Sequence, residues 1–298
     1  MSNLLPKGQG RSMIASQAMA HAMEPMPDYD NPPVVEAILG VQFDRLPKFR
    51  NAHLGAFWHS LGTGDWPTVV DAPLLSQQFE TFEEGANWAK GLRVQVTHDP
   101  ASRLQIKNRD TDRMIQVQNN RLHLNWLGKA GGCYPRYRNI CADFFTVLDQ
   151  FTGFVAQNQL GDLRANQWEI TYVNHIPEGT VWNTSADWDF FKLISNSPKA
   201  NQLVEEESFG GEWHFVIPPR LGRLHIEWQH GIKSEGENQN QKFIRLTLTG
   251  RGPIEKHEDA KAAIRAGFEI GHDRIVRTFK NLMSDQANKY WGLKNAGN

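Results

Sequence analysis

The feature that most constrains the fold is an order of elements that occurs twice along the chain. Each occurrence starts with an extended, mainly apolar stretch that carries an early glutamate: residues 34–43 with Glu36, and residues 167–176 with Glu169. A helix, several strands separated by turn residues and a long amphipathic helix then follow. This order predicts an α+β fold of two β-α-β(n)-α units, with antiparallel sheets that are each backed by a long C-terminal helix.

A length of 298 residues allows two modest domains or one large domain. We place the first α+β unit at 31–161 and the second at 162–298. Residues 1–30 hold five of the seven methionines, so we interpret them as a mobile tail, or alternatively as an arm that docks on a partner. No run approaches the ~18 apolar residues of a membrane span, and two cysteines fit a reducing compartment. The expected location is therefore the cytoplasm, without a membrane partner.

Periodicity assigns the individual elements. We predict helices at 48–61, from about Tyr137 to near Gly161, at 186–195 and at 258–283, and a short helix that Ser284 caps. We predict the remaining strands at 75–82, 93–97, 103–109, 114–118, 121–127, 212–217, 223–229 and 242–249. The order of these elements is similar to that of the TATA-binding-protein-like and helix-grip folds, which is an analogy that carries no function.

The two early glutamates lie on strands whose faces are both mainly apolar. A carboxylate in such a strand is costly unless it is paired. We therefore interpret Glu36 and Glu169 as structural ion-pair candidates, each with an arginine of a neighbouring strand. A functional carboxylate is the alternative.

Four short stretches carry a resemblance: Asn31-Pro-Pro-Val-Val-Glu36, Tyr134-Pro-Arg-Tyr137, Tyr172-Val-Asn-His-Ile-Pro177 and Tyr290-Trp-Gly292. In this order they resemble a sporadically distributed family of uncharacterised bacterial proteins, which open with a Pro-Pro-x-Val-Glu strand and close with Trp-Gly. The resemblance implies a bacterial protein of a mobile-element or defence-linked system, and it supplies no activity. Gly40 and Gln42 depart from the family pattern, where an acidic or bulky residue and an arginine are expected.

Motifs of the common enzyme chemistries are missing from the sequence. His225-Ile-Glu227 has the spacing of a zinc deaminase, but no Pro-Cys-x-x-Cys accompanies it. The chain contains neither a nucleophile elbow nor a phosphate-binding Gly-rich loop with its Lys-Ser/Thr. We therefore predict no metal, no cofactor and no catalytic residue, and the question of an enzyme stays open with a preference for a non-enzymatic protein.

Basic residues gather in the first unit. Ten Lys and Arg stand against three Asp between positions 90 and 138. Period-two alternation places a set of them on one face of the predicted strands: Arg103, Lys107, Arg109, Arg121 and His123. Such a face suits phosphates or an acidic partner, although an ordinary solvated face is the simpler explanation.

The sequence leaves three functions open. The first hypothesis is a non-enzymatic interaction or regulatory protein that binds a protein partner through an open sheet face and exposed aromatic residues. The second is a nucleic-acid-binding module that uses the basic face. The third is a small-ligand binder or an enzyme, which requires a cavity of roughly 300–1,000 Å³ between the sheet and a long helix, with converging polar groups.

Overall fold

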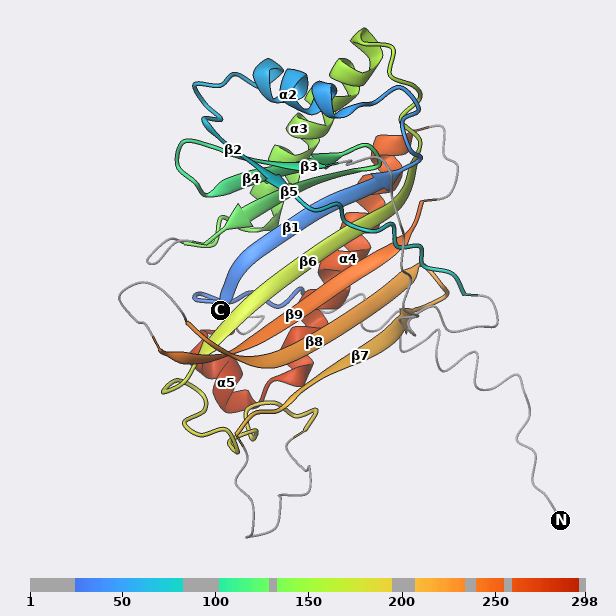
Figure 1. The fold of residues 1–298 in the computed structure, drawn as a ribbon. Helices are drawn as coiled ribbons and strands as arrows, with labels where there is room; N and C mark the ends of the chain where they lie inside the picture. The colour runs from blue at the N-terminus through green and yellow to red at the C-terminus, as the bar shows by residue number, and fades with distance from the viewer. Residues whose placement is uncertain are drawn as a thin grey trace, which may run out of the picture.

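A computed structural model describes residues 25–82, 102–128, 133–194, 207–233, 240–254 and 259–294. These residues form a mixed helix and sheet structure, in which all strands belong to one nine-stranded sheet and every pairing is antiparallel. The helices cover one face of this sheet (Figure 1). The predicted α+β class is therefore confirmed, but the strands join into one continuous sheet and not two.

The strands are β1 (Val34–Phe43), β2 (Thr68–Ala72), β3 (Arg103–Lys107), β4 (Arg113–Gln118), β5 (Arg121–Leu127), β6 (Ala165–Pro177), β7 (Gly210–Ile217), β8 (Gly222–Ile232) and β9 (Lys242–Pro253). The helices are α2 (Asn51–Ser60), α3 (Tyr137–Gln157), α4 (Ala260–Leu282) and α5 (Asp285–Tyr290). The spatial order is β2-β3-β4-β5-β1-β6-β9-β8-β7, so β1 and β6 pair at the centre. In each half of the sheet the first strand in sequence lies beside the last. A division into two duplicated units stays a prediction.

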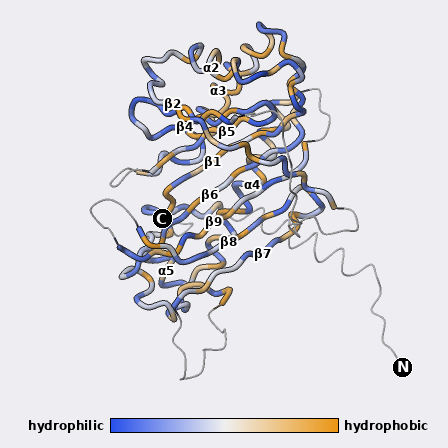
Figure 2. The backbone as a smooth tube through the Cα atoms, viewed as in Figure 1, coloured by the Kyte–Doolittle hydropathy of each residue, from blue (hydrophilic) through white to orange (hydrophobic). Residues whose placement is uncertain are grey.

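The core lies between the sheet and the long helices. Alternate residues of β1 face the helices and are fully buried: Ala37, Leu39, Val41 and Phe43. Figure 2 shows the corresponding alternation of apolar and polar positions along the strands. Helix α4 contacts β6 closely, because Gly267 and Gly271 face the Trp168 and Ile170 side chains.

Replacing Gly267 with alanine is expected to destabilise the protein. A Cβ atom there would overlap with Cγ and Cδ1 of the buried Trp168 indole. We expect a loss of about 1–3 kcal/mol from overpacking, although alanine favours a helix by about 1 kcal/mol. At Gly153 of α3 a Cβ atom would meet no other atom within 4 Å, so Gly153→Ala is the matched control and should be stabilising. Urea denaturation of both variants measures the difference, and equal effects of the two would contradict this account of the packing.

Three predicted elements are wrong or lie elsewhere. Residues 75–82 are not a strand, because their backbone groups bond to side chains of the sheet and not to another strand. A strand instead precedes them as β2. No helix forms within the described part of 186–195, where the chain makes a series of turns. The strand predicted at 93–97, and most of the predicted tail, lie outside the described residues.

No helix in the described part of the chain combines the length and the apolar character that crossing a membrane requires.

Candidate functional site

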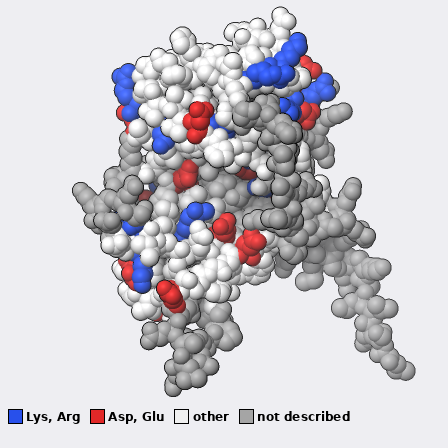
Figure 3. All heavy atoms as spheres, viewed as in Figure 1, with Lys and Arg blue, Asp and Glu red and all other residues white. Residues whose placement is uncertain are grey.

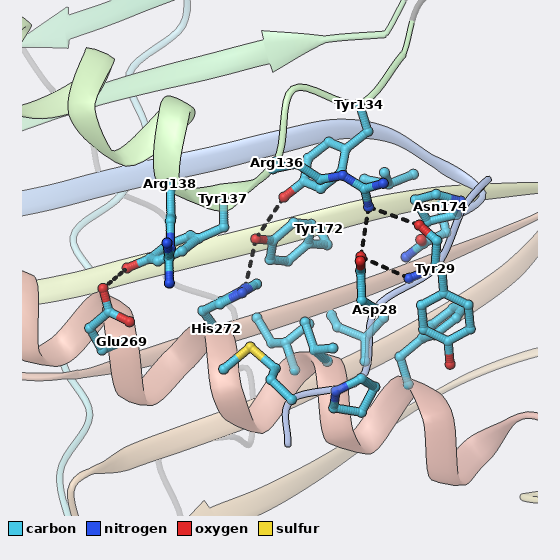
Figure 4. Close-up of a pocket in the computed structure, with 18 residues that line it drawn as sticks. Asp28, Tyr29, Tyr134, Arg136, Tyr137, Arg138, Tyr172, Asn174, Glu269 and His272 are labelled. Carbon is cyan, nitrogen blue, oxygen red and sulfur yellow. Dashed lines mark hydrogen bonds and ion pairs between the residues drawn. The ribbon is translucent and has the colours of Figure 1, made fainter. Parts of the chain in front are cut away.

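A cavity of about 660 Å³ lies on the helix side of the sheet. Residues of β6 and β9 form its floor, α4 and the start of α3 form two walls, and the segment before β1 forms another side (Figure 4). Apolar surface from aromatic and aliphatic side chains dominates this lining, and polar groups converge among them. The lining consists of Met26, Pro27, Asp28, Tyr29, Pro32, Val34, Tyr134, Arg136, Tyr137, Arg138, Tyr172, Asn174, Leu248, Glu269, His272, Ile275, Val276 and Phe279.

The segment before β1 is bound to the C-terminal end of the chain. Tyr29 forms a β-bridge with Leu293, and its hydroxyl donates to Asn288 Oδ1 at 2.7 Å. Asp28 accepts hydrogen bonds from Arg136 at 2.8 Å and from Lys294 at 2.7 Å. The two ends of the folded chain are therefore fastened together beside the cavity, which fixes one of its sides.

A directed chain of hydrogen bonds crosses the cavity. The Tyr134 hydroxyl donates to the Tyr172 hydroxyl at 3.1 Å, and the Tyr172 oxygen lies 2.9 Å from His272 Nδ1. Because Tyr172 accepts from Tyr134, its single hydroxyl proton is available for Nδ1. On this arrangement we assign neutral His272 the tautomer that accepts at Nδ1 and carries its proton on Nε2, which presents an N–H donor.

Tyr137 holds the His272 ring in place. The two rings stack with centroids 4.0 Å apart and an interplanar angle of 10°, and the Tyr137 hydroxyl donates to Glu269 Oε1 at 3.0 Å. Arg138 lies exposed at the rim and forms no hydrogen bond or ion pair with any residue that the structure describes. The site therefore combines oriented aromatic faces, an N–H donor and an unpaired cation.

Burial keeps His272 and the three tyrosines of the hydrogen-bond chain and the stacked pair neutral at pH 7. It lowers the pKa of His272 to about 4, although the neighbouring Asp273 opposes this shift. Burial raises the pKa of Tyr134, Tyr137 and Tyr172 above the ordinary tyrosine range. At neutral pH the hydrogen-bond chain is therefore uncharged.

The lowered pKa of His272 makes the protein sensitive to acid. Between about pH 6.5 and 4 the unfolded chain binds a proton that the folded chain excludes, so stability falls as the pH falls through this window. His272→Gln removes this coupling between folding and protonation. Between pH 7 and pH 4.5 the variant should therefore lose about 2.5 kcal/mol less stability than the wild type loses. Urea denaturation at both pH values measures it. An identical pH dependence of the two proteins would contradict the lowered pKa.

The predicted basic residues are dispersed on the opposite face of the sheet. Arg121 and His123 are buried, and Arg121 donates to Gln42 Oε1 and to the Ser76 carbonyl. The expectation of an open face is therefore wrong at these two positions, because residues 73–82 cross the face there. Figure 3 shows acidic and basic side chains interspersed on this side of the molecule.

The other three predicted basic residues are more accessible. Arg103 is partly buried and donates to Gln116 Oε1 of β4. Lys107 is half-buried, whereas Arg109 is exposed and donates to the Gly64 carbonyl at 2.7 Å. The five residues do not form one accessible patch.

The two glutamates share this polar face but differ in their partners. Glu169 forms an ion pair with Arg251 of the neighbouring β9 at 2.6 Å. Glu36 accepts a hydrogen bond from Asn125 of β5 at 2.6 Å, and no ion pair within 4.0 Å joins it to a described residue. The expected arginine partner is therefore present for Glu169 and absent for Glu36 among the described residues.

Gly40 and Gln42, the two residues that depart from the pattern of the similar family, each fit a neighbouring residue in the structure. A Cβ atom at Gly40 would overlap with the buried His123 ring, so glycine leaves room for the imidazole. Gln42 bonds to both the N–H and the C=O of Gln78.

No protein-family model matches the chain, and no curated protein matches it. The family resemblance therefore stays a prediction. The stretches on which it rests nevertheless meet in space: Pro32, Val34, Tyr134, Tyr137, Tyr172 and Asn174 line the cavity. The last stretch lies beside the first, since Asn31 N–H donates to the Trp291 carbonyl.

Sequence reasoning missed His272, Glu269 and Val276 as cavity residues. They belong to α4, whose amphipathic pattern indicates only a helix that packs on the sheet. The spacing of His272 and Glu269 by three positions places both on one helix face, and this was the only available signal.

Proposed function

We propose that the protein binds a small molecule in the cavity between α3, α4, β6 and residues 26–34. The observation that carries this proposal is the cavity itself, because about 660 Å³ with mainly apolar walls, five of whose side chains are Tyr or Phe, and a few converging polar groups is typical of a small-ligand site. This corresponds to the third hypothesis from the sequence, restricted to binding.

The lining favours a ligand with a flat, apolar body and at least one hydrogen-bond acceptor. The cavity offers surface for an aromatic group, because the stacked pair of Tyr137 and His272 and the side chain of Phe279 line it. The Nε2–H of His272 provides a donor whose direction the Tyr134–Tyr172 chain fixes. Arg138 at the rim favours an acceptor that carries negative charge, such as a carboxylate.

The nucleic-acid hypothesis has less support from the structure. Two of its five residues, Arg121 and His123, are buried, with Arg121 bonded to the Ser76 carbonyl, and they do not reach a phosphate backbone in this conformation. A protein partner stays a proposal, with exposed Trp213 and Phe215 on the edge strand β7 as one accessible aromatic surface.

Thermal denaturation with a set of matched probes tests the proposed function. The probes are 2-naphthoate, its neutral amide and the aliphatic cyclohexanecarboxylate, each at millimolar concentration. We expect 2-naphthoate to raise the melting temperature most, because only it supplies both a flat ring system and an anionic acceptor. If none of the three shifts the transition, the proposed ligand class is wrong.

A further inference from the structure

A segment of the chain crosses the other, polar face of the sheet. Residues 73–82 leave the end of β2 and cross the polar face, contacting in turn β4, β5, β1, β6, β9 and β8 (Figure 1). Residues 73–102 connect the adjacent strands β2 and β3, a connection that usually needs two to five residues. The topology does not require so long a path, so the crossing needs another explanation.

The sheet holds this segment chiefly through its main chain. Gln118 Oε1 accepts from Leu75 N–H, and Gln118 Nε2 donates to the Leu75 carbonyl, both at 3.0 Å. Gln42 makes the same pair of bonds to Gln78, at 3.0 and 2.7 Å. Gln167 Oε1 accepts from the Glu80 N–H at 3.2 Å. Side-chain amides that bond to backbone amides bind an extended chain whatever its side chains are.

One side chain of the segment is an anchor. Glu80 is the only buried residue among 73–82, and its carboxylate lies 2.6 Å from Arg223 Nη1, 2.8 Å from His225 Nε2 and 3.3 Å from Arg251 Nη1. Arg223 also donates to the Thr81 carbonyl at 2.8 Å. The sheet therefore offers a built site for one carboxylate beside three positions that recognise a backbone.

The other side chains of the segment contribute little to the core. Leu74 and Phe79 are 38% and 46% exposed, and Ser76, Gln77 and Gln78 are exposed as well. The segment buries little apolar surface, which is the main source of stability for a packed element. It is attached mainly by polar contacts, which a competing chain could reproduce.

We infer that the polar face of the sheet is a binding groove for an extended peptide with one acidic anchor residue. Residues 73–82 occupy this groove as an internal ligand. The partner that the groove binds is a segment of another protein. In the partner segment, the groove holds two residues by their main chains, as it holds Leu75 and Gln78. The acidic residue lies five positions after the first of these and two positions after the second, as Glu80 does. This groove is separate from the cavity and does not depend on the proposed small-molecule function.

A labelled peptide tests this inference with the full chain. The probe is fluorescein-labelled PLLSQQFETF, the sequence of residues 73–82, and fluorescence anisotropy measures its binding. The wild type should bind it weakly, because the attached segment competes at a high effective concentration. Glu80→Gln should bind it at least tenfold more tightly, since the internal ligand has lost its anchor. The control Glu227→Gln, an exposed position of β8 on the same face, should behave as the wild type.

The specificity of the groove provides the second part of the test. A peptide with glutamine at the position of Glu80 should bind the Glu80→Gln protein at least tenfold more weakly than the unchanged peptide does. A peptide with serine at the positions of Gln77 and Phe79 should bind this protein as tightly as the unchanged peptide. If Glu80→Gln is folded by circular dichroism but binds the peptide no better than the wild type, the segment is a fixed part of the fold and the inference is wrong. If two copies of the chain exchange their segments, which a dimer would reveal, the inference that the partner is another protein is also wrong. Should Glu80→Gln not fold, Gln78→Pro, which removes one main-chain donor, serves for the same measurement.

Discussion

Replacing Glu169 with glutamine is expected to lower the free energy of unfolding by about 3 kcal/mol. The change leaves the buried guanidinium of Arg251 without its partner at 2.6 Å. We expect the lower end of the range for a broken buried ion pair, because Glu80 still lies 3.3 Å from Arg251. Burial alone would raise the pKa of Glu169, but the charge of Arg251 and its hydrogen bond lower it to about 2.

The same replacement at Glu36 should have the opposite or no effect. Burial raises the pKa of Glu36 despite the hydrogen bond from Asn125, so the ionised carboxylate destabilises the fold at neutral pH. A glutamine keeps an acceptor for Asn125 and removes the buried charge. Glu36→Gln is therefore expected to be neutral or slightly stabilising, and it serves as the matched control for Glu169→Gln.

Urea denaturation at pH 7 and pH 3 measures both variants. The contribution of Glu169 is present above the ordinary glutamate pKa and is lost as the pH falls toward about 2, so the difference between wild type and Glu169→Gln should shrink in acid. Equal losses of stability in the two variants at pH 7 would contradict the assignment of only Glu169 to an ion pair.

Replacing Val276 with tryptophan is expected to abolish binding in the cavity, with an affinity loss of at least 100-fold. Val276 lines the cavity from α4 and makes none of its hydrogen bonds, so a larger side chain would occupy ligand volume and leave the Tyr134–Tyr172–His272 chain intact. Because the new side chain enters an existing cavity, we expect little loss of stability.

The matched control for this change is Ala266→Trp. Ala266 lies on the exposed face of the same helix, so the variant adds the same side chain without entering the cavity. Isothermal titration with 2-naphthoate should give wild-type affinity for Ala266→Trp and no measurable heat for Val276→Trp. Equal affinities in both variants would mean that the probe binds elsewhere.

Much of the fold could be predicted from the sequence because its signals are periodic. The apolar run of β1 indicates a central strand and the apolar stripes of α3 and α4 indicate helices that bury one face, and the structure contains each of them. The sequence predicts a strand at 75–82, and the structure places no strand there. The backbone of this segment bonds to glutamine side chains from three distant strands, and no local pattern contains that information.

The candidate site could be predicted less well than the fold. Arg103, Lys107, Arg121 and His123 lie on strands of the sheet, whereas Arg109 lies in the turn after β3, and the burial of Arg121 involves a segment that crosses from another part of the chain. Tyr134, Tyr172 and His272 lie far apart in sequence, and only the pairing of β1 with β6 and the packing of α4 bring them together. A cavity is a property of this packing, so its volume and its lining have no signature in a single sequence.

The most direct test of the small-molecule proposal is a comparison of the compounds that three forms of the protein retain. Wild type, Val276→Trp and Ala266→Trp are dialysed against a bacterial metabolite extract, and the retained compounds are identified by mass spectrometry. We predict at least one compound that wild type and Ala266→Trp retain and Val276→Trp does not. The same set of compounds on all three proteins, or no compound on the wild type, would contradict a ligand site in the cavity.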